Sequence, residues 1–166
     1  MKPVPIDAFE FGRGKDRRDG EVAVAELPRL AQECVDTSGF LRWEIVGGTH
    51  TSGHAQLVMH VAGDVQLVCQ RCLRPFAYPI LSASTLVLAR DEAQADQIEA
   101  MLDDEALDVI VGSAAMNLAD LIEDEALLAI PQAPKHVSCP GTGVPIRIDD
   151  SDAKPSPFAV LKNLKH

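Results

Sequence analysis

The stretch AQLVMHVAGDVQLVC, residues 55–69, decides the fold. Apolar residues occupy every second position at 55–61 and again at 65–69. A two-residue period is typical of a strand with one face in the core. Gly63 and Asp64 stand between the two runs, in the position of a tight turn. The sequence therefore predicts two antiparallel strands that are joined at this turn.

Strands are also predicted on both sides of this stretch. Apolar residues at positions 41, 43 and 45 alternate with charged ones, and the Gly47-Gly48 pair is expected to end that strand. The predicted strands cover 21–26, 41–45, 55–61, 65–69, 78–89 and 107–111, with a short helix at 27–35 and a solvated loop or weak helix at 92–106. The middle of the chain is expected to be an antiparallel meander.

Residues 118–130 have the period of an amphipathic helix. Asn117 is placed to cap its N-terminus, and Pro131 ends it because proline lacks the N–H that the helix needs. Glu125 projects from the middle of the apolar face. It is expected either at a partly wet edge or paired with a cation of the sheet, or else as a buried carboxylate held by Arg or His.

These elements predict the α+β class. An antiparallel sheet or partly open barrel is built from 21–90 and 107–111, and the helix at about 117–130 covers it. The chain is expected to be a single domain, 1–166, because it has about one domain's length. Within it we expect an extended basic N-terminal arm at 1–20, a core at 21–139 and a C-terminal tail at 140–166. The arm is predicted to be a loop or strap, because residues 12–20 are all glycine or charged.

The net charge of −10, from 15 Lys and Arg against 25 Asp and Glu, would by itself argue against binding to nucleic acid. Its distribution changes that inference. Residues 91–125 hold twelve acidic side chains and no Lys or Arg, so the other 131 residues carry 13 acidic and 15 basic side chains. The acidity is local, and an RNA contact elsewhere on the chain is compatible with it.

Several classes of protein are excluded by signals that the sequence lacks. It contains no run of about 20 apolar residues and no export signal at its start, so we expect a cytoplasmic protein that does not enter a membrane. It also contains no Walker or Rossmann phosphate loop, no GxSxG elbow and no HExxH pair. We therefore do not expect an enzyme, and no catalytic residue is assigned.

Cys69 and Cys72 form a CxxC motif, the sharpest local signal in the chain. Two thiols at this spacing suit a zinc knuckle, and His136 with Cys139 would complete a tetrahedral Cys₃His site. A thioredoxin-like redox pair also fits a CxxC, as does a pair of reduced thiols at the end of a strand. From the residues alone these three interpretations remain open, and zinc is the only cofactor that they suggest.

Basic side chains outside the acidic segment are the candidates for RNA binding, because guanidinium and ammonium groups pair with phosphate oxygens. Arg71 and Arg74 flank the CxxC motif, although Arg71 could instead neutralise Glu125. The full set of candidates is Arg13, Lys15, Arg17, Arg18, Arg71, Arg74, Lys162 and Lys165.

Three separated segments together resemble the YceD family of large ribosomal RNA subunit accumulation proteins. They are VCQRCLRPF at 68–76, NLADLIEDEALLAIPQAPKH at 117–136 followed by Cys139, and KPSPFAVLKNLK at 154–165. The resemblance implies a role in the synthesis, processing or stability of 23S ribosomal RNA, and so in assembly of the large ribosomal subunit. The family's characteristic positions correspond to Cys69, Arg71, Cys72, Glu125, Pro131, Pro134, His136, Pro157 and Phe158.

The expected function is that of a non-enzymatic factor whose partner is ribosomal RNA or a precursor of the large subunit. Contact with RNA would use the basic side chains and should weaken with salt, because each neutralised phosphate releases counterions. One alternative is an adaptor whose acidic segment binds a ribosomal protein or an rRNA-processing enzyme. A second alternative is a regulator that responds to zinc or to redox state.

Overall fold

The computed structural model describes residues 5–102 and 107–140. The chain divides into two units, residues 1–136 and 137–166, and the architecture below is that of the first. Pro157, Phe158, Lys162 and Lys165, together with most of the predicted tail, lie outside the described residues.

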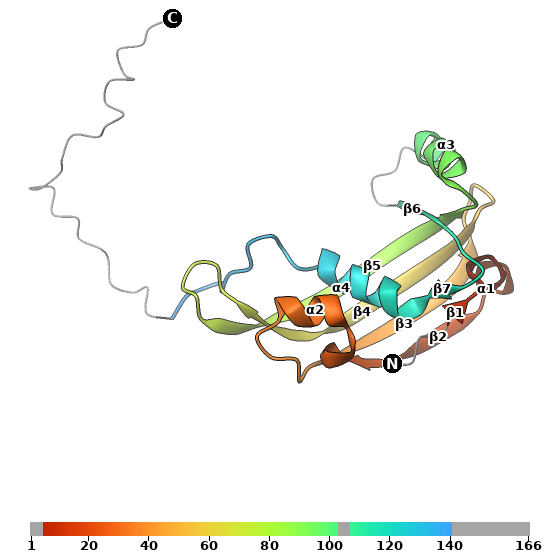
Figure 1. Ribbon diagram of the computed structural model, residues 1–166. Coiled ribbons are helices and arrows are strands. Elements are labelled where there is room, and N and C mark those ends of the chain that lie inside the picture. Colours follow the sequence, from red (N-terminus) through yellow and green to blue (C-terminus); the bar gives the residue numbers. More distant parts are fainter. Residues whose placement is uncertain (1–4, 103–106, 141–166) are drawn as a thin grey trace, which may run out of the picture. The chain divides into compact units, whose positions relative to one another are not determined.

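A five-stranded sheet in the order β2-β3-β4-β5-β6 forms the centre of the first unit (Figure 1). Its strands are β2 (Arg17–Ala23), β3 (Phe40–Thr49), β4 (Ala55–Val68), β5 (Pro75–Ala89) and β6 (Asp108–Val111). A small second sheet pairs β1 (Pro5–Ile6) with β7 (Met116–Asn117). The helices are α1 (Ala8–Gly14), the 3₁₀ turn η1 (Val24–Glu26), α2 (Pro28–Glu33), α3 (Glu92–Leu102) and α4 (Leu118–Leu128). The predicted α+β class is confirmed, and the sheet is open rather than closed into a barrel.

Different helices cover the two faces of the sheet, over different parts of its length. Along most of the sheet, the core lies on the face that α4 covers, where Ile122 of the helix belongs to the same buried cluster as Ile45 and Leu57 of the strands. On the opposite face, α3 packs its Ile98 against Val87 and buries a smaller apolar cluster at one end of β5. Both helices stabilise the sheet, because each Å² of apolar surface that is removed from water contributes about 25 cal/mol of free energy.

The predicted turn at Gly63 and Asp64 is wrong, because both residues lie inside the 14-residue strand β4. Gly63 pairs with Ile80, and the ladder to β5 continues past it. The glycine serves a close approach of two strands instead, since a Cβ at this position would lie 2.5 Å from the carbonyl oxygen of Phe40. The Gly47-Gly48 pair likewise does not end β3, because a Cβ on Gly47 would lie 2.2 Å from the carbonyl oxygen of Phe11 in α1.

The predicted loop at 12–20 is also corrected, because it contains the end of α1 and the start of β2. Asp7 caps α1 by accepting from the N–H groups of Phe9 and Glu10. β2 is an edge strand that pairs with β3 along all seven of its residues. A charged strand can form at such an edge because backbone pairing stabilises it while its side chains stay in water, which composition alone does not reveal.

β6 joins the sheet parallel to β5, whereas the other neighbours in the sheet are antiparallel. The helix α3 makes this direction possible, since it carries the chain back along the sheet before β6 begins. The segment that was predicted as a loop or weak helix therefore contains a helix from Glu92 to Leu102. No helix of the described residues is both long and apolar enough to cross a membrane.

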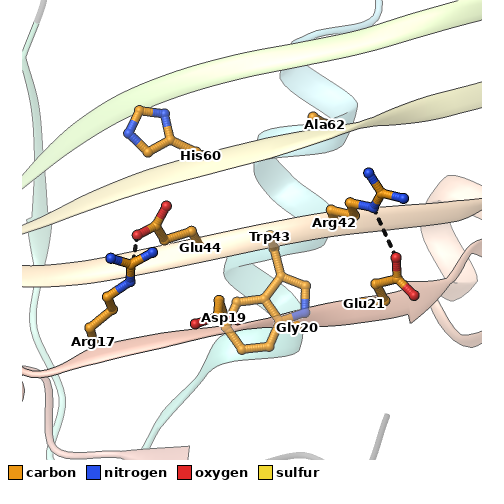
Figure 2. Close-up of a pocket in the computed structure, with 9 residues that line it drawn as sticks. All are labelled: Arg17, Asp19, Gly20, Glu21, Arg42, Trp43, Glu44, His60 and Ala62. Carbon is orange, nitrogen blue, oxygen red and sulfur yellow. Dashed lines mark hydrogen bonds and ion pairs between the residues drawn. The ribbon is translucent and has the colours of Figure 1, made fainter.

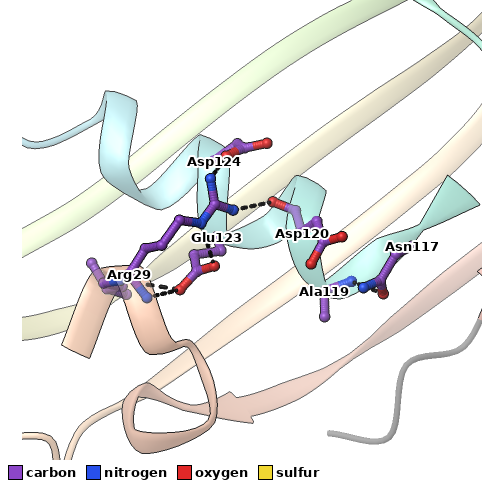
Figure 3. Close-up of polar contacts among 7 residues, drawn as sticks. Arg29, Asn117, Ala119, Asp120, Glu123 and Asp124 are labelled. Carbon is purple, nitrogen blue, oxygen red and sulfur yellow. Dashed lines mark hydrogen bonds and ion pairs between the residues drawn. The ribbon is translucent and has the colours of Figure 1, made fainter. Parts of the chain in front are cut away.

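The helix α4 begins where the sequence predicts, with the Asn117 side chain accepting from the N–H of Ala119 at 3.1 Å. Its Glu123, which the helical pattern puts among solvent-facing acids, is instead 3% exposed. The Glu123 carboxylate accepts from the N–H of Arg29 at 2.6 Å and of Leu30 at 3.1 Å, and from the Arg29 guanidinium at 2.8 Å (Figure 3). It thereby caps α2, whose own N-terminal residue Leu27 provides no side-chain cap.

Replacing Glu123 by alanine is expected to lower the free energy of unfolding by about 2 kcal/mol, because the buried N–H of Leu30 and the partly buried N–H of Arg29 lose their acceptor. Urea denaturation would measure the loss. Asp124→Ala is the matched control: it removes a carboxylate that contacts the same arginine from a 51% exposed position, so its effect should stay below about 1 kcal/mol. Equal losses in the two variants would contradict the capping role.

Gly63→Ala is expected to destabilise the protein by about 2–3 kcal/mol, because the new Cβ meets backbone that cannot move without disturbing the ladder. Gly48→Ala is the control within the same sheet. Its Cβ would meet only the flexible Gln56 side chain, at 3.3 Å, so the loss should be below about 1 kcal/mol. A tolerated Gly63→Ala with unchanged thermal unfolding would refute the close approach.

Candidate metal centre

The CxxC motif lies in the connection between β4 and β5, at residues 69–74. Two backbone hydrogen bonds close this turn, from the N–H of Leu73 to the carbonyl of Cys69 at 2.9 Å and from the N–H of Cys69 to the carbonyl of Arg74 at 3.0 Å. Leu73 has a φ of 58°, a left-handed conformation that is costly for a residue with a Cβ. The turn is thus held in a tight form that keeps both thiols close together.

The segment that follows α4 lies against this turn. The N–H of Gln70 donates to the carbonyl of Pro134 at 2.8 Å, and the Arg71 guanidinium donates to the carbonyl of His136 at 3.0 Å. The His136 ring packs on the Phe76 ring, with 4.7 Å between the ring centroids. These contacts position the imidazole beside the two cysteines, although 63 residues separate Cys72 from His136 in the sequence.

The candidate ligand atoms of Cys69, Cys72 and His136 all lie within 4.8 Å of one another. Cys72 Sγ is 3.4 Å from His136 Nδ1. In a tetrahedral zinc site with Zn–S bonds of about 2.3 Å, ligand atoms are about 3.8 Å apart. The three groups therefore fit such a site without a large rearrangement, and their thiolate and imidazole donors are the types that zinc prefers. Cys139, the fourth residue of the predicted site, is three residues after His136 and belongs to the second unit.

Cys69 is held in an environment that favours the thiolate. Burial of the enclosed Cys69 sulfur raises its pKa. The backbone N–H groups of His136, Cys72 and Arg71 and the His136 side chain outweigh this effect and lower the pKa to about 5. The His136 N–H lies 3.5 Å from the sulfur. Because the thiolate is the form that binds metals, the N–H groups that surround Cys69 prepare it to act as a ligand.

The candidate RNA-binding cations that lie in the described part of the chain fall into two separate groups. Arg71 and Arg74 are exposed at the metal-centre turn, beyond the end of β4. Arg13, Lys15, Arg17 and Arg18 are exposed around α1 and the start of β2. Arg17 pairs with Val46 of β3, which in turn pairs with Val58 of β4. About eleven residues of strand lead from Val58 to the turn at Cys69, so about 35 Å separates the two groups. They form two patches rather than one.

The cations of β2 are also partly engaged within the sheet. On the face opposite α4, a hollow of about 600 Å³ contains Arg17 paired with Glu44 at 2.7 Å and Arg42 paired with Glu21 at 2.9 Å (Figure 2). Arg18 instead lies over the Phe11 ring, 5.8 Å from its centroid. Among the described candidates, Arg74 beside the cysteines is therefore better placed to meet a phosphate than Arg17, or than Arg71, which donates to the carbonyl of His136.

Glu125 is buried, at 6% exposure, but neither Arg nor His holds it. Its carboxylate accepts from the hydroxyls of Ser82 and Ser84 in β5, the latter at 2.9 Å. Arg71 does not neutralise it, since that guanidinium is directed at His136. Sequence reasoning missed the two serines, because only the register of β5 brings alternate hydroxyls under α4. It also missed Phe76, the ring that supports His136, although Phe76 lies in the segment that carries the family resemblance.

Comparison with known proteins assigns the chain to a family. Residues 57–165 match the sequence profile of the large ribosomal RNA subunit accumulation protein YceD family. The protein of that name from Haemophilus influenzae is 26% identical over 171 residues, which cover 98% of this chain and 95% of the relative. No solved structure matches. Since the profile covers well over half of the chain and includes both halves of the candidate metal centre, the chain belongs to the YceD family of large ribosomal RNA subunit accumulation proteins.

Proposed function

We propose that this protein is a non-enzymatic factor that promotes the accumulation of large-subunit ribosomal RNA, through its synthesis, processing or stability. The near full-length similarity to a relative named for that role carries the proposal. A role without catalysis is supported by the buried acids of the described residues. Glu123 and Glu125 both accept hydrogen bonds from groups that belong to the fold itself. We propose the cytoplasm as its location, since large ribosomal subunits are assembled there.

The RNA contact that we propose centres on the metal-centre turn. Arg74 and Arg71 are exposed there, and the acidic segment 91–125 does not include this turn. The exposed cations around α1 provide a second contact about 35 Å away. Two contacts at this separation suit a folded RNA or a precursor particle better than a short single strand, because one extended partner can reach both.

We further propose that Cys69, Cys72, His136 and Cys139 bind zinc. Once bound, zinc supplies a tetrahedral cross-link and no redox chemistry. The residues of the chain do the rest: Phe76 supports the imidazole, and the backbone of 134–136 is tied to the turn by Gln70 and Arg71. The centre would thus hold the exposed arginines in a fixed position for RNA. An imidazole beside Cys72 favours this structural role over a redox pair.

Crosslinking in cells followed by sequencing of the attached RNA tests the proposed function. Large-subunit ribosomal RNA is expected to be recovered, and Arg74→Ala is expected to reduce that recovery because it removes an exposed phosphate contact. With the purified protein, Arg74→Ala should lower the slope of log affinity against log salt by about 0.7. Arg42→Ala, which removes an exposed arginine that is already paired with Glu21, is the control. An unchanged slope, or recovery of unrelated RNA only, would overturn the proposal.

Native protein that is purified without chelators is expected to contain close to one zinc per chain, measured by elemental analysis. Cys72→Ser should lower the zinc content and the thermal stability, because it removes one of the thiolates. Cys34→Ser is the matched control, since Cys34 is half-buried and belongs to no group of candidate ligands in the described chain. The absence of zinc from the wild type, or equal effects of the two substitutions, would rule out the site.

A further inference from the structure

An apolar groove of about 540 Å³ runs between α4 and the edge of the sheet at β5 and β6. Eight of its twelve lining residues are apolar and the other four are acidic. Leu86 of β5 is at the buried floor, and the half-buried Ile110 of β6 and Leu121 of α4 belong to opposite walls. Leu128 in the last turn of α4 is 80% exposed. Within the described chain, this groove is an apolar surface that α4 leaves uncovered.

The charge of the groove has one sign. Glu99 of α3 and Asp108 of β6 are exposed lining residues, and Asp124 and Glu125 line it from α4. Asp124 also pairs with Arg29 of α2. None of the twelve lining residues is basic. Apolar walls with acidic residues between and around them are complementary to a ligand that is apolar on one side and cationic on the other.

Glu125 gives the groove a fixed negative charge. Glu125 lines the groove although it is 6% exposed, and the hydroxyls of Ser82 and Ser84 keep its carboxylate in place against the sheet. A carboxylate fixed among leucine side chains attracts a cation more strongly than an exposed one does, because the surrounding dielectric constant is lower. Neutral hydroxyl donors leave its negative charge in place for a ligand.

We propose that this groove binds a basic amphipathic segment of a partner protein. Apolar side chains of that segment would pack on Leu86, Leu121 and Leu128, and its Lys or Arg side chains would meet Asp108, Glu99 and Glu125. A helix with apolar residues three and four positions apart has the shape for such a groove. The occupant is a protein rather than RNA, since the acidic residues repel phosphate. This binding site goes beyond the proposed RNA contact, which is centred on the turn at the other end of β5.

A synthetic helical peptide with leucines on one face and lysines on the other provides the probe. We expect the full-length protein to bind the labelled peptide in a fluorescence anisotropy titration. Leu128→Asp and Asp108→Lys should each weaken binding about tenfold, because one removes an apolar anchor and the other reverses a charge. Both positions are exposed, so neither substitution disturbs the core, and circular dichroism would verify the fold.

Each variant has a matched control. Leu81→Asp makes the same change at a leucine that is 85% exposed in β5 but outside the groove. Asp96→Lys makes the same change in charge at an exposed position of α3 outside the groove. Both controls should bind within about twofold of the wild type. Because the titration contains no RNA, its failure would leave the RNA proposal intact, and failure of the crosslinking experiment would leave the groove intact.

Four outcomes would overturn the inference. One is that the peptide does not bind, and another is that groove and control variants weaken its binding equally, which would mean that only the overall negative charge attracts it. A third is that a peptide of the same composition in scrambled order binds as well. The fourth is that analytical ultracentrifugation shows the wild type as a dimer and Leu128→Asp as a monomer. In that case the groove would bind a second copy of this chain.

Discussion

The backbone ladder between β4 and β5 is the interaction on which the rest of the structure depends. Thirteen residue pairs follow one another without a break, from Gln56 opposite Val87 to Val68 opposite Pro75. Because the ladder is continuous, the turn with the two cysteines lies at the tip of one hairpin, about 40 Å from the start of β4. The same ladder sets the register that brings Ser82 and Ser84 under α4. The metal centre and the acidic groove are thus placed by a single set of hydrogen bonds.

The acidic side chains of α4 show how one helix can bury charge and still be stable. Glu123 is buried against the N-terminus of α2, where backbone N–H groups and Arg29 satisfy it. Glu125 is buried against β5, where two hydroxyls satisfy it. Each carboxylate loses its hydration, and the hydrogen bonds from the surrounding donors offset that cost. The two acids have different consequences: Glu123 anchors a neighbouring helix, whereas Glu125 adds negative charge to a groove.

The candidate metal centre could be predicted only in part. The CxxC spacing identifies Cys69 and Cys72 because a short turn brings such a pair together whatever the rest of the chain does. His136 is different, since the 63 residues between it and Cys72 include the strands β5, β6 and β7 and the helices α3 and α4. No local pattern specifies that approach. It depends on α4 returning the chain to the tip of the hairpin, where Pro134 and His136 accept hydrogen bonds from the turn.

The sequence by itself determined the α+β class, the helix with its Asn117 cap and the local character of the acidity, because periodicity, capping chemistry and composition act over short distances. It also determined the family, which three sequence segments identify whatever their positions in the fold. Only the tertiary structure decided that Gly63 serves a close approach rather than a turn, that the charged segment 12–20 contains part of an edge strand, and that Glu123 caps a helix more than 90 residues away in the chain. Each of these depends on which backbone groups meet across the fold. A glycine, a charged strand and a glutamate look the same in the sequence whether or not such a partner exists.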